Sequence, residues 1–230
     1  MQRLYHCTML NQILTVVINI IFPRTYLERY LSKCSQLEFT SRLTPRIQVQ
    51  EHQFSPFYYK EQLVKDCIIE LKERNNKDTA RLFGQILAQY VLQNIQIIYK
   101  NNIHENCFLV PIPQHISKTK EKGFLHTQTL SEEILKHTLQ RNPDLNISIL
   151  PCIQKISQTK RLHDLKGKIK RFKTIKHTMR AHLTKHNARH SYFFIVDDIF
   201  TTGATFKEAR RTLLESGVLQ EHMFFISIAH

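Results

Sequence analysis

The segment YFFIVDDIFTTGAT, residues 192–205, decides the fold class of this chain. Its first five residues form a continuous apolar run, which indicates a strand that is buried on both faces of a sheet. Two adjacent acids, Asp197 and Asp198, follow this run. A short polar turn around Gly203 then leads into an amphipathic segment that Gly217 closes. The segment therefore predicts a strand, a tight turn and a helix, with the acids at the carboxyl end of the strand.

Each part of this segment has a chemical role. Ionised carboxylates accept two hydrogen bonds apiece, which suits the paired hydroxyl groups of a ribose. The turn offers hydroxyl and backbone N–H donors, and the amino end of the helix adds partial positive charge, so that a phosphate monoester fits there. The residues predicted to form this site are Asp197, Asp198, Thr201, Thr202, Gly203, Ala204 and Thr205.

Helical and apolar segments alternate through much of the chain. Helices are expected over residues 60–74, from an N-cap at Asp78 toward Tyr99, over 127–139 and over 205–216, and buried strands over 107–112, 147–153, 192–196 and 223–228. This alternation predicts an α/β fold with a central, mainly parallel sheet flanked by helices. Ligands of such sheets bind beyond the carboxyl ends of the strands. Residues 1–56 lack a clear period and are expected to form a small irregular appendage to a domain over 57–230.

The charge of the chain favours an anionic partner. Lys and Arg number 33 against 19 acidic residues among 230, and 11 of these basic residues fall within residues 160–189, where Asp164 is the one acid. Such a stretch suits nucleic acid or a nucleotide precursor that carries pyrophosphate. A solvated loop kept soluble by its charge is the alternative interpretation.

The cysteines and the N-terminal residues favour a cytoplasmic protein without a membrane span. The five cysteines are at least 27 positions apart, which indicates neither a disulfide framework nor a paired metal site. The apolar run over residues 13–22 is interrupted by Asn19 and is too short to cross a bilayer. It is expected to be a buried helix or strand, with a signal-peptide core or a membrane-surface anchor as the alternatives.

The order of apolar run, acid pair, threonines and glycine resembles the phosphoribosyl-pyrophosphate signature of type I phosphoribosyltransferases. Further motifs resemble the ComF family of competence proteins over about residues 57–229. They are LKERNNKDTARLFGQILA, VPIP at 110–113, SKTKEKGF at 117–124, Gln158 with Leu162, Arg171, and VDDIFTTGAT. The chain departs from that family where Leu125 and His126 replace an Asn-Gln pair, and where residues 1–56 lack the CxxC motifs of its zinc ribbon. Cys34 stands alone there, so a zinc-ribbon relic without zinc is expected.

The resemblance implies a ligand and its partners. It implies that Asp197 and Asp198 are candidate catalytic residues that hold the ribose, and that Mg²⁺ is bound through the pyrophosphate rather than directly by the protein. The implied pyrophosphate loop and mobile flap contain Pro111, Lys118, Lys120, Lys122, Gly123, Lys160, Arg161 and Arg171. Catalysis would stabilise a ribosyl cation-like transition state by positioning and charge, without a protein nucleophile.

Three functions remain open at this point. The first is a ComF-like protein that binds phosphoribosyl pyrophosphate, or another ribose 5-phosphate ligand, and serves DNA uptake together with a competence helicase. The second is an active nucleobase or amine phosphoribosyltransferase of nucleotide salvage or biosynthesis. The third is a non-catalytic module that binds single-stranded DNA, with the basic stretch over residues 160–189 along the nucleic-acid backbone. Neither the acceptor substrate nor the oligomeric state has a signature in the sequence.

Overall fold

The structure is a computed structural model that describes residues 26–43, 48–50, 52–101, 105–114, 119, 121–156, 177–184 and 188–230. The chain divides into two compact units, residues 1–34 and 35–230. In the first unit the described element is helix α2, Tyr26–Lys33. The predictions for residues 13–22 and for most of the basic stretch lie outside the described residues. Within the described part of the chain, no helix combines the length and the hydropathy needed to cross a membrane.

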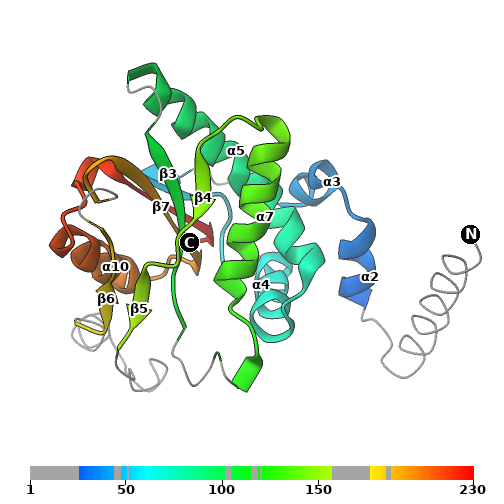
Figure 1. The fold of residues 1–230 in the computed structure, drawn as a ribbon. Coiled ribbons are helices and arrows are strands. Elements are labelled where there is room, and N and C mark those ends of the chain that lie inside the picture. The colour runs from blue at the N-terminus through cyan, green and yellow to red at the C-terminus, as the bar shows by residue number, and fades with distance from the viewer. Residues whose placement is uncertain are drawn as a thin grey trace, which may run out of the picture. The chain divides into compact units, whose positions relative to one another are not determined.

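A six-stranded sheet forms the centre of the second unit (Figure 1). Its strands, in spatial order, are β1 (Gln48–Gln50), β2 (Gln53–Ser55), β8 (Met223–Ala229), β7 (Ser191–Ile199), β3 (Asn106–Pro111) and β4 (Ile147–Ile149). The edge strand β1 pairs antiparallel with β2, and the other five strands run parallel. These pairings confirm the prediction of an α/β fold with a mainly parallel sheet. Strands β7 and β8 have almost continuous apolar sequences because helices cover both faces of the sheet there.

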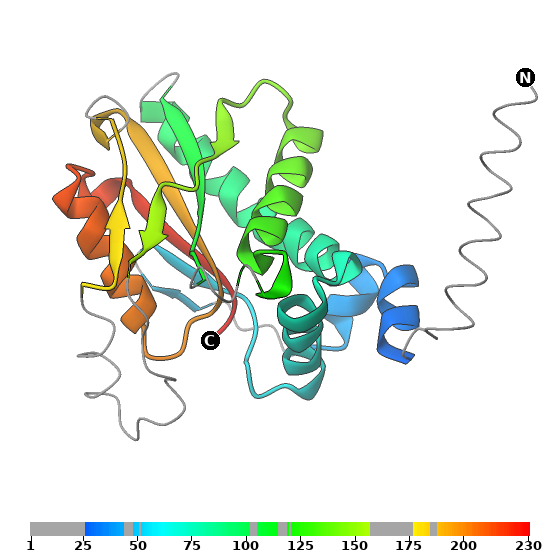
Figure 2. The same ribbon diagram turned by 60° about the horizontal axis from the view of Figure 1, so that its bottom comes forward.

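Different elements cover the two faces of the sheet (Figure 2). Helices α5 (Lys77–Asn101) and α7 (His126–Arg141) lie on one face, and α7 packs against β3, β4 and β7. Helix α4 (Gln62–Arg74) packs on α5, as does α3 (Gln36–Ser41). On the opposite face helix α10 (Ala204–Glu215) packs on a core that includes Phe193, Ile195 and Phe225.

A second, two-stranded sheet lies beside α10. Strands β5 (Ile153–Lys155) and β6 (Met179–Ala181) pair antiparallel. Three side chains of α10 hold β6: Glu208 Oε1 accepts the Met179 N–H at 3.1 Å, Arg211 Nη2 donates to the Met179 carbonyl at 3.1 Å, and Thr212 Oγ1 accepts the Ala181 N–H at 2.8 Å. The hairpin is therefore fixed to the helix that follows the acid pair.

The four predicted helices are present as α4, α5, α7 and α10, with small shifts of their ends. The predicted strand over residues 147–153 is instead two strands, β4 and β5, in different sheets. Pro151 lies between them and cannot donate a ladder hydrogen bond. The expected N-cap at Asp78 is wrong, because Asn76 Oδ1 accepts the Thr79 N–H at 2.9 Å.

The residues expected to form an appendage include elements of the sheet. Strand β2 pairs with β8, and Phe57 forms an isolated parallel bridge with Ala229. Helix α3 begins after Ser35, whose hydroxyl accepts the Glu38 N–H. The described residues from Ser35 to Ser55 thus belong to the same unit as those after position 56.

Candidate phosphate and ribose site

The predicted strand, turn and helix around Gly203 are all present. Strand β7 ends at Ile199, and α10 begins at Ala204. Gly203 is the N-cap residue and has φ +68°, a conformation that side chains other than glycine rarely adopt. A Cβ atom at this position would lie 2.8 Å from Cζ of Phe200. Both the backbone and the neighbouring ring therefore require glycine here.

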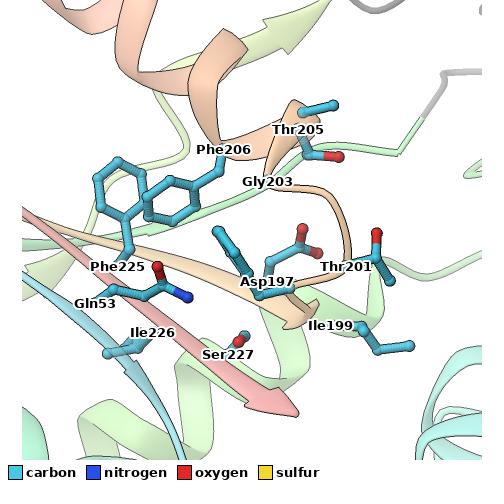
Figure 3. A pocket seen from close by; sticks show the side chains of 12 residues that line it. Gln53, Asp197, Ile199, Thr201, Gly203, Thr205, Phe206, Phe225, Ile226 and Ser227 are labelled. Atoms are coloured by element: carbon cyan, nitrogen blue, oxygen red, sulfur yellow. The ribbon is translucent and has the colours of Figure 1, made fainter. Parts of the chain in front are cut away.

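The turn and the helix end supply hydrogen-bond donors. The first N–H groups of a helix have no intrahelical partner, and they carry the positive end of the helix dipole. Among the described residues, the N–H groups of Ala204, Thr205 and Phe206 donate to no backbone carbonyl. The hydroxyls of Thr201 and Thr205 lie close to this end of α10 (Figure 3). An oxyanion at this position would receive several hydrogen bonds without displacing any protein group.

A small pocket, partly open to solvent, joins these donors to the first acid. Its lining includes Asp197 from β7, the turn, and the amino end of α10. Figure 3 shows the Asp197 carboxylate directed into the same space as Thr201 and Thr205.

Asp197 has an unusual environment for a carboxylate. Its Oδ1 accepts the N–H of Asp198 at 2.9 Å. Burial raises the pKa of Asp197 to about 6, although the positive charges of Lys72 and Lys155 act in the opposite direction. The ionised form is thus short of hydrogen-bond donors, and ligand hydroxyls would supply them.

The far end of the pocket lies on strands β2 and β8. Ser227 is the register neighbour of Asp197, and Gln53 is that of Phe225. Ser227 Oγ lies 2.6 Å from Ser55 Oγ, so the two hydroxyls are hydrogen-bonded. In Figure 3 the Gln53 amide points toward the space beside Asp197. This side of the pocket adds neutral polar groups to the site.

Asp198 lies on the opposite face of β7 from Asp197, because successive side chains of a strand alternate. It is buried, and its Oδ2 lies 2.5 Å from Lys72 Nζ and 3.0 Å from His126 Nε2. Neither approach has the geometry of a regular hydrogen bond, so the contacts are mainly electrostatic. The pocket lining therefore contains one acid of the pair and not the other.

His126 connects this ion pair to the loop after β3. Its Nδ1 lies 2.5 Å from Nε2 of Gln114. Burial, and then the charges of Lys72 and Lys122, lower the pKa of His126 to about 3, so the ring is neutral at ordinary pH. An amide nitrogen can only donate, which makes Nδ1 the acceptor and places the ring proton on Nε2, the ring nitrogen that lies nearer to Asp198.

The other residues of the predicted site do not all lie at the pocket. Pro111 ends β3 beside Val196, at the edge of the sheet where the parallel strands have their carboxyl ends. Gly123 has φ +72° and open space around its Cα. The ammonium of Lys122 donates to the Lys72 carbonyl at 2.9 Å and to Glu73 Oε2 at 2.7 Å, so it is bound to the end of α4. Thr202 belongs to the turn and does not line the pocket.

Five predicted residues lie outside the described residues. They are Lys118, Lys120, Lys160, Arg161 and Arg171. The segment with the last three connects β5 to β6, and the Ile156 N–H donates to the Thr178 carbonyl at 2.8 Å where that segment leaves the hairpin. The pyrophosphate loop and the flap stay predictions for these positions.

Sequence reasoning missed Lys72, His126, Gln53 and Ser227. Lys72 belongs to the LKERNNKDTARLFGQILA run, so the family resemblance already drew attention to this segment. Nothing in the sequence predicted that Lys72 contacts Asp198. Gln53 stood in the segment expected to be irregular, and Ser227 is a single polar residue within a buried strand. No protein-family model matches this chain, and no curated protein sequence has significant similarity to it.

Proposed function

We propose that this chain is a type I phosphoribosyltransferase-like protein that binds phosphoribosyl pyrophosphate or another 5-phosphorylated ribose. One observation carries the proposal: Asp197, Thr201 of the turn and the amino end of α10 with Thr205 line the same pocket. A phosphate at the helix end and sugar hydroxyls at the carboxylate would satisfy both groups of one molecule. The parallel sheet, with this pocket at the carboxyl end of β7, agrees with that assignment.

Different residues would bind the phosphate and the ribose of the ligand. The N–H groups of Ala204, Thr205 and Phe206 and the hydroxyls of Thr201 and Thr205 would bind the 5-phosphate. Asp197 would accept the ribose hydroxyls. Each charge-assisted hydrogen bond contributes about 1.5 to 3 kcal/mol, so three or four of them would contribute about 4.5 to 12 kcal/mol toward binding.

Magnesium would enter this site with the ligand. Mg²⁺ usually keeps several of its bound water molecules and binds readily to phosphate oxygens, where it neutralises negative charge. The described residues include no group of three or more His, Cys, Asp or Glu side chains placed to hold a metal ion. The resemblance implies that a pyrophosphate group on the ligand would supply ligands to the ion.

A transfer reaction would need positioning more than covalent chemistry. Departure of pyrophosphate leaves positive charge on the ribose, and an ionised Asp197 on the hydroxyls would stabilise that charge as it develops. Binding at both ends of the ribose phosphate would hold the reacting carbon in place for an acceptor. We propose a cytoplasmic role in DNA uptake, on the basis of the ComF resemblance alone.

Calorimetry tests the binding site. Phosphoribosyl pyrophosphate with Mg²⁺ should bind the full chain with micromolar affinity, and Asp197→Asn should weaken binding at least about tenfold, or about 1.4 kcal/mol. Asp144→Asn is the matched control, because Asp144 is exposed on the turn before β4. Equal affinity of wild type and Asp197→Asn would refute the assignment. Release of pyrophosphate with a panel of nucleobases and amines would then show whether transfer occurs.

A further inference from the structure

The two acids of the motif have unlike surroundings. Asp197 faces the pocket below α10, whereas Asp198 faces α4 and α7 on the other side of the sheet. The side chain of Asp198 is 7% exposed, and that of Lys72 is 34% exposed. A buried carboxylate with an ammonium at 2.5 Å and an imidazole at 3.0 Å already has its charge compensated.

We propose that Lys72 and His126 are positioning residues that hold Asp198 as a structural carboxylate, which leaves Asp197 as the acid of the pair that contacts the ligand. This inference rests on the proposed function for its ligand. It departs from the sequence-based expectation that both acids hold the ribose.

The exposures of Lys72 and Asp198 predict an asymmetry between the partners. If Asp198 loses its charge, the ammonium of Lys72 can turn toward water, because a third of that side chain is already exposed. If Lys72 is removed, the carboxylate of Asp198 stays buried without a compensating cation. Replacement of Lys72 should therefore destabilise the fold more than replacement of Asp198, and replacement of both should recover much of the loss.

His126 and Gln114 restrict where the carboxylate of Asp198 can lie. The Nε2 atom of the neutral ring lies 3.0 Å from Oδ2, while Gln114 contacts the ring from the other side. These contacts join α4, β7, α7 and the loop after β3. A rotation of Asp198 toward the ligand pocket would break the contacts with both Lys72 and His126.

Lys72 also acts through the strand on Asp197. The groups that surround the pair are Lys72 from α4, His126 from α7 and Lys155 from β5, and both lysines lower the pKa of Asp197 against the effect of burial. Loss of the Lys72 charge should therefore raise the pKa of Asp197. A change in fold stability alone would not shift the titration of Asp197 in the folded protein.

The first experiment compares the two acids with ribose 5-phosphate as the probe. In calorimetry on the full chain, Asp197→Asn should weaken binding at least about tenfold, and Asp198→Asn less than about threefold. Equal losses in the two variants would overturn the inference, because Asp198 would then contact the ligand. Failure of the wild type to bind would refute the proposed function instead, and the second experiment would still decide the role of Lys72.

The second experiment needs no ligand. Urea unfolding should rank stability as wild type, then Asp198→Asn, then Lys72→Met, with Lys72→Met/Asp198→Asn above the Lys72 single variant. Nuclear magnetic resonance of the Asp197 carboxyl carbon should show a higher titration midpoint in Lys72→Met. Lys65→Met, an exposed lysine of the same helix, should change neither. An unchanged midpoint in Lys72→Met, or a double variant less stable than both single variants, would overturn the inference.

Discussion

Replacing Asp197 by Asn should make the ligand-free protein more stable at neutral pH. Burial raises the pKa of this carboxyl from 3.8 to about 6, which means that its ionised form destabilises the fold. Asparagine has nearly the same shape, and its Oδ1 can still accept the N–H of Asp198. The substitution therefore removes the charge and keeps the local contacts.

The magnitude and the sign follow from the proton affinity of the two states. Between pH 3.8 and about 6 the folded protein holds a proton at Asp197 that the unfolded chain has released. The wild-type free energy of unfolding accordingly falls as pH rises through this window, and it stays lower above it. A rise from 3.8 to about 6 corresponds to about 3 kcal/mol. Because Asp197 is partly exposed, about 1 to 3 kcal/mol is the expected gain at pH 8.

Urea unfolding of wild type and Asp197→Asn from pH 4 to pH 8 measures this effect. The stability difference should be small at pH 4, should increase up to about pH 6, and should be constant above about pH 7. Asp144→Asn should show no such increase, because its carboxyl is exposed. A difference that does not change with pH would refute the argument, since the loss of a destabilising charge cannot act equally where that charge is absent.

Three further predictions concern residues around the site. Gly203→Ala should lower stability by about 1 to 3 kcal/mol and weaken ribose 5-phosphate binding, since its φ is +68°; unchanged calorimetric unfolding and affinity would contradict this. Burial opposes ionisation of Glu208, but hydrogen bonds from Arg211 and from the N–H of Met179 outweigh it and lower its pKa. Glu208→Gln should therefore cost about 1 to 3 kcal/mol in urea unfolding, and a loss well below about 0.5 kcal/mol would show that the carboxylate is not needed to hold β6. The ring of His126 should remain neutral down to about pH 4, because burial and two nearby lysines lower its pKa to about 3; a proton resonance of the ring that titrates near pH 6.5 would contradict this.

The local part of the fold could be predicted from sequence because its signals lie within a few residues of one another. The apolar run before Asp197, the glycine at 203 and the amphipathic segment after it specify strand, turn and helix independently of the rest of the chain. Pro151 was an equally local signal, and it explains why one predicted strand is two. The cap at Asn76 was missed because Asp78, two positions later, is an equally good capping residue by type.

The roles of the two acids could not be separated because the strand was predicted to end too early. The strand was predicted to end at Val196. Both acids would then lie in a turn, where the directions of their side chains could not be predicted. Strand β7 instead continues to Ile199, so the strict alternation of side chains applies to Asp197 and Asp198. The partner of Asp198 is Lys72, 126 positions earlier in the chain, and no periodicity connects residues at that separation.

Because successive side chains of β7 point to opposite faces of the sheet, Asp197 and Asp198 have different electrostatic surroundings. Two adjacent uncompensated carboxylates near one ligand would repel each other and would also repel a phosphate bound at the end of α10. Directing Asp198 to the α4 face, where Lys72 compensates its charge, limits the negative charge in the pocket to Asp197. The ammonium of Lys72 still lowers the pKa of Asp197 from behind the strand. A carboxylate with a pKa of about 6 is then largely ionised at neutral pH and able to accept hydrogen bonds from hydroxyl groups, while the end of the pocket at α10 offers N–H and hydroxyl donors.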